Sequence, residues 1–88
     1  MAESPPTTGE LFKAKAITAE DLHAAVDAYI ADPTTTLFLM GEGYGLDLAE
    51  AVRTHEPSRK AFESPDESPI FKRTMVQTAI ILARPAKR

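Results

Sequence analysis

The stretch from Ser68 to Arg84 limits the fold most, because it holds the densest apolar run and has clear start and stop signals. Ser68 is a good helix N-cap, and Pro69 then occupies the first helical position, where its missing N–H costs nothing. Pro85 ends the helix after Arg84, whose charge suits the negative end of the helix dipole. One broad helical face is apolar. It consists of Phe71, Met75, Val76, Ala79, Ile80, Leu82 and Ala83.

The same stretch also has strand-like features, because Thr74–Leu82 is rich in β-branched residues. Both alternating faces would be apolar, so such a strand would have to lie in the centre of a buried sheet. The start signal and the length favour a helix, and the strand stays open as the alternative.

Two further helices are predicted upstream. Thr18, followed three residues later by Asp21, resembles a capping box and predicts a helix over Thr18–Ala31. Its apolar stripe consists of Leu22, Ala25, Val26, Tyr29 and Ile30. The other helix is predicted over Leu46–His55, with Asp47, Glu50 and Arg53 outward. Its apolar side consists of Tyr44, Leu48, Ala49, Ala51 and Val52.

These patterns predict a mainly α fold: one small helical domain over residues 10–85, with three main helices and short pieces. Residues 1–9 are predicted to be a disordered tail and residues 86–88 a basic tail. The alternative is an α+β fold in which two helices cover a three-stranded sheet. Its strands would be Leu11–Ile17, Thr35–Met40 and Thr74–Leu82.

Composition excludes several classes of site. The chain has no cysteine, so it has neither a disulfide framework nor a thiolate metal site. The longest apolar run, Ala79–Ala83, is far shorter than the roughly 20 residues of a membrane span. The first residues lack the pattern of a signal peptide. We therefore expect a soluble cytoplasmic protein that does not bind membranes.

Charge is divided unevenly along the chain. Residues 1–50 hold nine acidic and two basic side chains, a net charge of −7. Residues 51–88 hold four acidic and eight basic side chains, a net charge of +4. Such asymmetry indicates either charge complementarity inside the fold or a bipolar docking surface, and the internal explanation is the simpler one.

The segment Gly41–Gly45 (G-E-G-Y-G) resembles the first motif of nucleotide- and methyl-donor-binding α/β enzymes. Its spacing is G-x-G-x-G rather than G-x-G-x-x-G, and Glu42 and Asp47 put negative charge where a phosphate would lie. A chain of 88 residues is also too short for the several βαβ units of that fold. We therefore interpret the segment as a turn that needs positive φ.

No residue pattern predicts catalysis or metal binding. His23 and Asp27 lie four residues apart on one predicted helix, which we interpret as a surface pair. A zinc or di-iron site would need three or four protein ligands, and no second ligand pair has a suitable spacing. Neither His23 nor His55 has a serine motif nearby. We predict that the chain is not an enzyme and binds no cofactor.

By elimination, we predict a non-catalytic protein–protein interaction module, such as an adaptor, an inhibitor or a small structural subunit of a bacterial or phage assembly. Ile70 and Ile81 fall outside the main apolar face of the last predicted helix. With Arg73 and Arg84, they are the candidate partner-binding residues. The partner would be another protein or a second copy of the chain, unless a neighbouring short element covers the two isoleucines.

The alternative function is a small nucleic-acid-binding regulator that uses the basic C-terminal third of the chain. The bases concerned are Lys72, Arg73, Arg84, Lys87 and Arg88. A helix-turn-helix would place its reading helix over Pro33–Met40, which carries no Arg, Lys, Asn or Gln for base edges. The negative net charge also disfavours nucleic acid.

Overall fold

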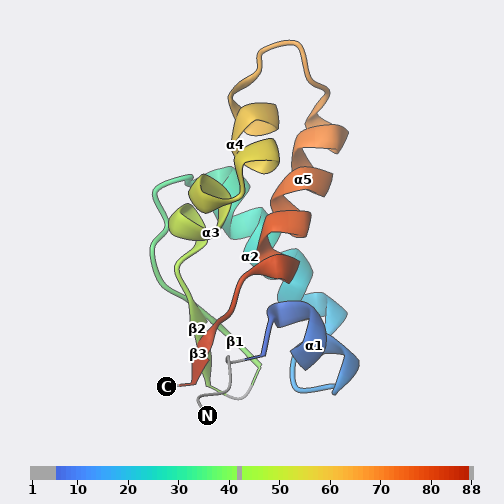
Figure 1. The fold of residues 1–88 in the computed structure, drawn as a ribbon, viewed down its shortest axis with the longest axis vertical. Helices are drawn as coiled ribbons and strands as arrows, with labels where there is room; N and C mark the ends of the chain where they lie inside the picture. Colours follow the sequence, from blue (N-terminus) through green and yellow to red (C-terminus); the bar gives the residue numbers. More distant parts are fainter. Residues whose placement is uncertain (1–5, 42, 88) are drawn as a thin grey trace.

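Helix α5 (Pro69–Leu82) is central to the computed structural model, which describes residues 6–41 and 43–87 (Figure 1). It packs against α1 (Thr8–Lys13), α2 (Ala19–Ala31), α3 (Leu48–Thr54) and α4 (Glu56–Glu63). A small antiparallel sheet contains β1 (Phe38–Met40), β2 (Tyr44–Leu46) and β3 (Ala86–Lys87), with β2 in the middle. The prediction of a mainly α fold is confirmed, and Thr74–Leu82 is helical rather than extended.

The start of α5 follows the predicted capping pattern. The Ser68 Oγ accepts a hydrogen bond from the Phe71 N–H at 3.1 Å, and Pro69 takes the first helical position. Val76, Ala79 and Ile80 are buried. Phe71 and Leu82, which the apolar pattern placed on the same face, are 43% and 55% exposed. The neighbouring helices and the sheet therefore cover only part of the apolar face predicted for α5.

Helix α2 also matches its prediction, since Thr18 and Asp21 form both hydrogen bonds of a capping box. Four of its five predicted stripe residues are buried, whereas Ile30 is 39% exposed. Helix α3 is shorter than the predicted Leu46–His55. Leu46 pairs in β2, and the carboxylate of Asp47 caps the helix by accepting from the Glu50 N–H at 2.9 Å.

The folded chain starts earlier than predicted. Helix α1 begins at Thr8, inside the segment 1–9 that we expected to be a tail, and Thr7 caps it with Glu10 in a capping box. Thr8 is fully buried and donates twice to the Ala83 carbonyl oxygen, from its N–H at 2.8 Å and from Oγ1 at 3.2 Å. Residues 1–5 lie outside the described part. The alternative strand over Leu11–Ile17 is wrong, because α1 covers its first half.

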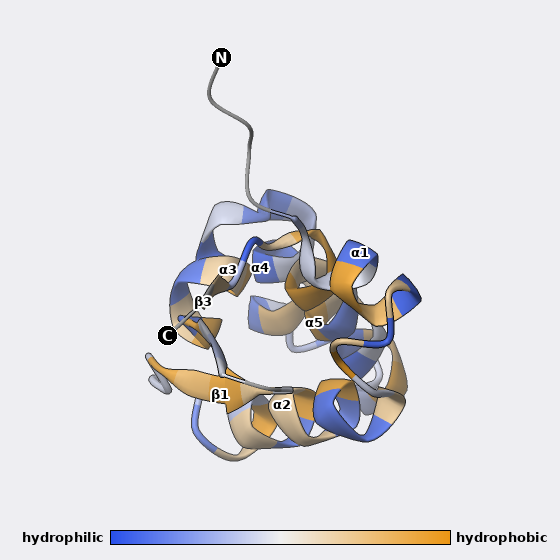
Figure 2. Cartoon of the chain, turned by 90° about the horizontal axis from the view of Figure 1, so that it is seen from below, coloured by the Kyte–Doolittle hydropathy of each residue, from blue (hydrophilic) through white to orange (hydrophobic). Residues whose placement is uncertain are grey.

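The glycine-rich segment forms the turn between β1 and β2. Gly41 and Gly43 have φ values of +58° and +94°, which favour glycine, as the turn interpretation requires. Glu42 lies outside the described residues. The strands pair with Phe38 opposite Leu46 and Met40 opposite Tyr44. Strand β1 is apolar along its length (Figure 2).

The segment 86–88, predicted to be a basic tail, contributes strand β3. Ala86 lies opposite Gly45 and Lys87 opposite Tyr44, while Arg88 lies outside the described residues. The sheet therefore joins the C-terminal segment to the hairpin before α3. It lies at one end of the molecule, and the loop between α4 and α5 lies at the other (Figure 1).

The hydrophobic core extends along α5 between the helices and the inner side of the sheet. Its largest fully buried apolar side chains are Ile17, Val26, Met40, Leu48, Val52, Val76 and Ile80. Tyr29 of α2 adds an edge-to-face contact with Phe62 of α4, with ring centroids 5.1 Å apart. Within residues 6–41 and 43–87, no helix has the length and apolar character needed to cross a membrane.

Candidate functional site

A groove of about 680 Å³ lies where the sheet, α3 and the end of α5 meet. One wall is α3, with Asp47 just before it and Glu50 and Thr54 along it. The opposite wall is the end of α5 and the residues after it. The remaining lining residues are Thr36, Leu37, Gly45, Leu46, Ala51, Leu82, Ala83, Arg84 and Ala86. This volume is typical of pockets that hold small ligands or a few side chains of a partner.

Local hydrogen bonds hold the groove walls in place. The Thr35 carbonyl oxygen accepts from the Ala49 N–H at 2.9 Å, which ties the segment before β1 to the first turn of α3. Across the groove, the paired contact of Thr8 with Ala83 holds the end of α5. Gly45 contributes no side chain, so backbone forms that part of the lining. These contacts tie the segment that carries Thr36 and Leu37 to α3, and the end of α5 to α1.

The groove offers apolar surface to a ligand. Two leucines of its lining are strongly exposed. Leu37, just before β1, is 49% exposed, and Leu82, at the end of α5, is 55% exposed. Small side chains, Ala51, Ala83 and Ala86, lie between the larger ones. Exposed leucines beside small residues give a ligand room to bury apolar side chains, and each side chain fully buried gains about 1.5–3 kcal/mol before the costs of binding.

A smaller hollow of about 190 Å³ continues the groove toward His55, since both share Ala51, Thr54, Leu82 and Ala83. The Nδ1 of His55 lies 2.6 Å from the Ser58 Oγ, which itself donates to the Met75 carbonyl oxygen at 2.6 Å. Since the Ser58 proton is used on Met75, Nδ1 of His55 must carry a proton and donate to Ser58.

The His55–Ser58 contact brings a serine to one of the two histidines, neither of which has a serine motif nearby in the sequence. Ser58 is fully buried, and its hydroxyl proton points to a carbonyl oxygen rather than to a base. A nucleophilic serine donates its hydroxyl proton to the histidine and must be accessible to substrate. The arrangement joins the start of α4 to the middle of α5 and has the features of a structural contact.

Among the side chains that the structure describes, acids outnumber bases in the groove. The lining contains the acids Asp47 and Glu50 and the base Arg84. In the described part of the chain, the Glu50 carboxylate has no hydrogen bond or ion pair, whereas Asp47 caps α3. The pKa of Glu10 is lowered, first by hydrogen bonds from the Thr7 backbone and side chain and in smaller part by the charge of Arg84. Arg84 therefore also acts on a carboxylate of α1.

The four candidate partner-binding residues form two pairs on α5 and its C-terminal extension. Ile70 and Arg73 lie at the start of the helix, and Ile81 and Arg84 lie about 16 Å further along. Ile70 is 79% exposed. Ile81 is half-buried against α1, where its Cγ2 would lie 2.9 Å from a Cβ added to Gly9. A short neighbouring element thus covers Ile81, as the simpler explanation held.

Arg73 and Arg84 also have different surroundings. Arg73 forms an ion pair with Asp27 of α2, so Asp27 pairs with this arginine rather than with His23 as predicted. Arg84 lines the groove. The structure therefore brings one of the four candidates, Arg84, to the groove and leaves Ile70 and Arg73 toward the other end of α5.

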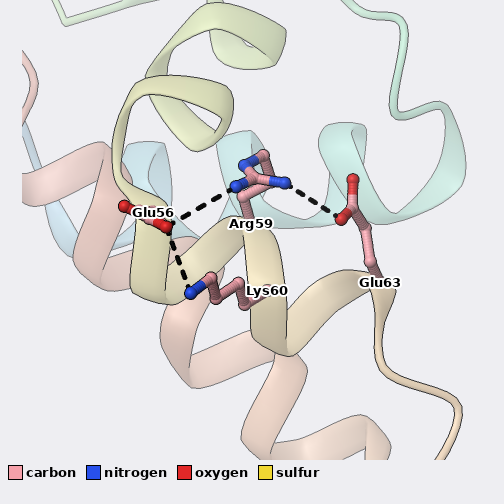
Figure 3. Close-up of polar contacts among 4 residues, drawn as sticks. All are labelled: Glu56, Arg59, Lys60 and Glu63. Atoms are coloured by element: carbon pink, nitrogen blue, oxygen red, sulfur yellow. Dashed lines mark hydrogen bonds and ion pairs between the residues drawn. The ribbon is translucent and has the colours of Figure 1, made fainter.

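Several bases of the C-terminal half are already paired with acids. On α4, Arg59 contacts Glu56 and Glu63, and Lys60 contacts Glu56 (Figure 3). The pair of Arg73 with Asp27 joins the basic second half to the acidic first half, as internal complementarity would require. These contacts leave fewer free cations for a nucleic-acid surface, and nucleic-acid binding stays a prediction.

Within residues 6–41 and 43–87, no group of three or more His, Asp or Glu side chains is placed to hold a metal ion. The groove acids Asp47 and Glu50 are a pair, and Asp47 is engaged as the α3 cap.

Sequence reasoning missed most of the groove. Glu50 is exposed on α3 as predicted, whereas Asp47 precedes the helix as its N-cap, and nothing in the spacing of these acids indicates that they share a groove with β3 and the end of α5. Leu82 was assigned to the core face. The available signal was the uncharged stretch Pro33–Gly41, which supplies Leu37 to the groove.

Comparison with known proteins adds no relative from which a function could be transferred. No protein-family model, no curated protein and no solved structure matches this chain. The interpretation of the groove therefore depends on its own residues.

Proposed function

We propose that this chain is a non-catalytic protein-interaction module that binds a segment of a partner protein in the groove between the sheet, α3 and the end of α5. One observation carries the proposal: the exposed Leu37 and Leu82 belong to a groove of about 680 Å³ that small side chains and the backbone of Gly45 help to line. An adaptor, an inhibitor or a small subunit of a larger assembly would all use such a surface.

Burial and chemistry support this function over catalysis. The His–Ser contact in the described chain uses its serine proton on a backbone carbonyl oxygen. The groove offers apolar surface and an acidic wall, which suit recognition of side chains. Exposed apolar residues grouped in a concave site are typical of surfaces that bind a partner.

A peptide selection tests the proposal directly. A phage-displayed peptide library is selected against the full chain, and the recovered peptides are measured for binding to variants. We expect Leu82→Glu and Leu37→Glu each to weaken binding at least tenfold, because each would place a charge against buried apolar groups. Both side chains are about half exposed, so both variants are expected to fold.

Two further variants make the experiment specific. Ile30→Glu is the matched control, because Ile30 is an exposed apolar residue on α2 outside the groove lining. Ile70→Glu tests the other exposed apolar position, at the start of α5. Recovered peptides that lose binding with Ile70→Glu but not with Leu82→Glu would show that the groove is not the docking site.

A further inference from the structure

The charge of the groove indicates which partner segments it accepts. Within the described residues, its lining holds two acids and one base, and the exposed carboxylate of Glu50 has no hydrogen bond or ion pair there. The Asp47 carboxylate lies at the same wall and caps α3. A partner that buries apolar groups beside this wall removes water from Glu50, and an opposite charge would offset that cost.

Arg84 does not balance this wall completely. The described lining of the groove holds two acids against this single base, so one negative charge stays uncompensated. The wall formed by Asp47 and Glu50 is on α3, whereas Arg84 follows α5 on the other side. A ligand that touches the α3 wall therefore meets net negative charge.

We infer that the partner segment carries a Lys or Arg beside apolar side chains, with the cation at Glu50 and the apolar groups against Leu37 and Leu82. This inference depends on the proposed function and specifies its ligand. Charge complementarity at the edge of an apolar site gives specificity, because an acidic segment of the same apolar content would meet Glu50 and Asp47 as like charges.

A second copy of the chain fits this groove less well. The strongly exposed apolar residue at the other end of α5 is Ile70, and it follows the acidic loop that contains Asp66 and Glu67. Docking that end into the groove would bring these acids toward Glu50 and Asp47. The bases that follow Ile70 are engaged within the chain, since Arg73 pairs with Asp27 and the Lys72 Nζ lies 6.0 Å from the centroid of the Phe62 ring. Like charges across an interface oppose association, so the occupant is a cationic segment of a different protein.

The test repeats the peptide selection on three forms of the full chain: wild type, Glu50→Gln and Glu20→Gln. Glu20 is an exposed acid in the first turn of α2 and serves as the matched control, since it lies outside the groove lining. We expect peptides selected on wild type and Glu20→Gln to be enriched in Lys or Arg next to apolar residues. This enrichment should fade with Glu50→Gln.

Affinities of synthetic peptides complete the test. A recovered peptide with its Lys should lose about three- to tenfold in affinity on Glu50→Gln, and less at high salt, while its Lys→Gln analogue should change little. Neutral or acidic peptides that bind as well as the cationic ones would overturn this inference and leave the proposed function intact. Recovery of no groove-dependent peptide would instead overturn the proposed function.

Analytical ultracentrifugation of the chain without peptide tests whether a second copy occupies the groove. We expect a monomer at the concentrations used for the peptides. Self-association that Leu82→Glu abolishes would show that a copy of the chain occupies the groove, and the inference of a cationic partner segment would be wrong.

Discussion

The Oγ of Ser58 donates a hydrogen bond to the backbone carbonyl oxygen of Met75 at 2.6 Å, although the two residues lie 17 positions apart. The same oxygen of Ser58 accepts from His55, so one buried hydroxyl links the junction of α3 and α4 to the middle of α5. The Ser58–Met75 hydrogen bond therefore helps to fix α4 against α5. Loss of the Ser58 hydroxyl leaves the half-buried Nδ1–H of His55 without an acceptor.

We predict that Ser58→Ala lowers the free energy of unfolding by about 1–3 kcal/mol, because the part-buried His55 Nδ1–H and Met75 carbonyl oxygen lose their hydrogen bonds to Ser58. Urea unfolding followed by circular dichroism measures the change. Thr54→Ala is the control. Its Oγ1 donates to the Glu50 carbonyl oxygen at an exposed position, so we expect a change within about 0.5 kcal/mol. Equal effects of the two variants would contradict the structural role of Ser58.

Lys15 ends α1 in a left-handed conformation, with φ of +65°, where side chains other than glycine are strained. We predict that Lys15→Gly stabilises the protein by up to about 1 kcal/mol, since glycine adopts this conformation without strain. The neighbouring Lys13→Gly, at a helical position, should destabilise it by about 0.5–1 kcal/mol. Thermal unfolding should show a higher midpoint temperature than wild type for Lys15→Gly and a lower one for Lys13→Gly. A loss of stability in both variants would contradict the prediction.

Gly41 combines a positive φ of +58° with a close approach to the segment after α1. A Cβ at this position would lie 2.2 Å from the Ala16 carbonyl oxygen, which is backbone and cannot move aside easily. We predict that Gly41→Ala destabilises the protein by more than about 2 kcal/mol, through strain of about 1–2 kcal/mol plus displacement of Ala16. Urea unfolding measures the change.

The matched variant is Gly43→Ala, because Gly43 has a positive φ of +94° in the same turn, whereas the 2.2 Å approach to the Ala16 carbonyl oxygen belongs to position 41. We expect it to cost less than Gly41→Ala. If both cost the same, backbone strain alone would explain the effect and the contact with Ala16 would contribute nothing.

The pKa of Glu10 is lowered by hydrogen bonds from the Thr7 N–H and Oγ1, and that of Asp32 by hydrogen bonds from Thr34. A carboxyl group whose pKa is lower in the folded state stabilises the protein above its unfolded pKa and loses that effect as pH falls through its folded pKa. We therefore predict that stability falls as the pH is lowered from about 5 to about 3.

Glu10→Gln removes one of these titrating groups. We expect this variant to be less stable than wild type at neutral pH and to lose less stability on acidification, because glutamine does not titrate. Unfolding curves at neutral and acidic pH measure the difference. Glu20→Gln serves as the control at another helix start, and an identical pH dependence in wild type and Glu10→Gln would contradict the role of the α1 capping box.

Local signals in the sequence predicted the two longest helices, α2 and α5, well, because caps and apolar periodicity act over a few residues. Ser68 with Pro69, and Thr18 with Asp21, begin α5 and α2 as expected. Leu46 shows the limit of such signals, since pairing with Phe38 in the sheet removed it from the predicted helix. The hydrogen bonds gained in the sheet are not encoded in the local helical pattern.

The sequence alone determined the helical class, the approximate extent of the main helices and the need for glycine at Gly41, because these depend on local backbone preferences. Only the tertiary structure decided that Thr8 joins Ala83, that β3 joins the sheet and that Glu50 shares a groove with Leu37 and Leu82. Each of these depends on contacts between distant segments. No local pattern specifies them, since they form only when burial of the common core brings the segments together.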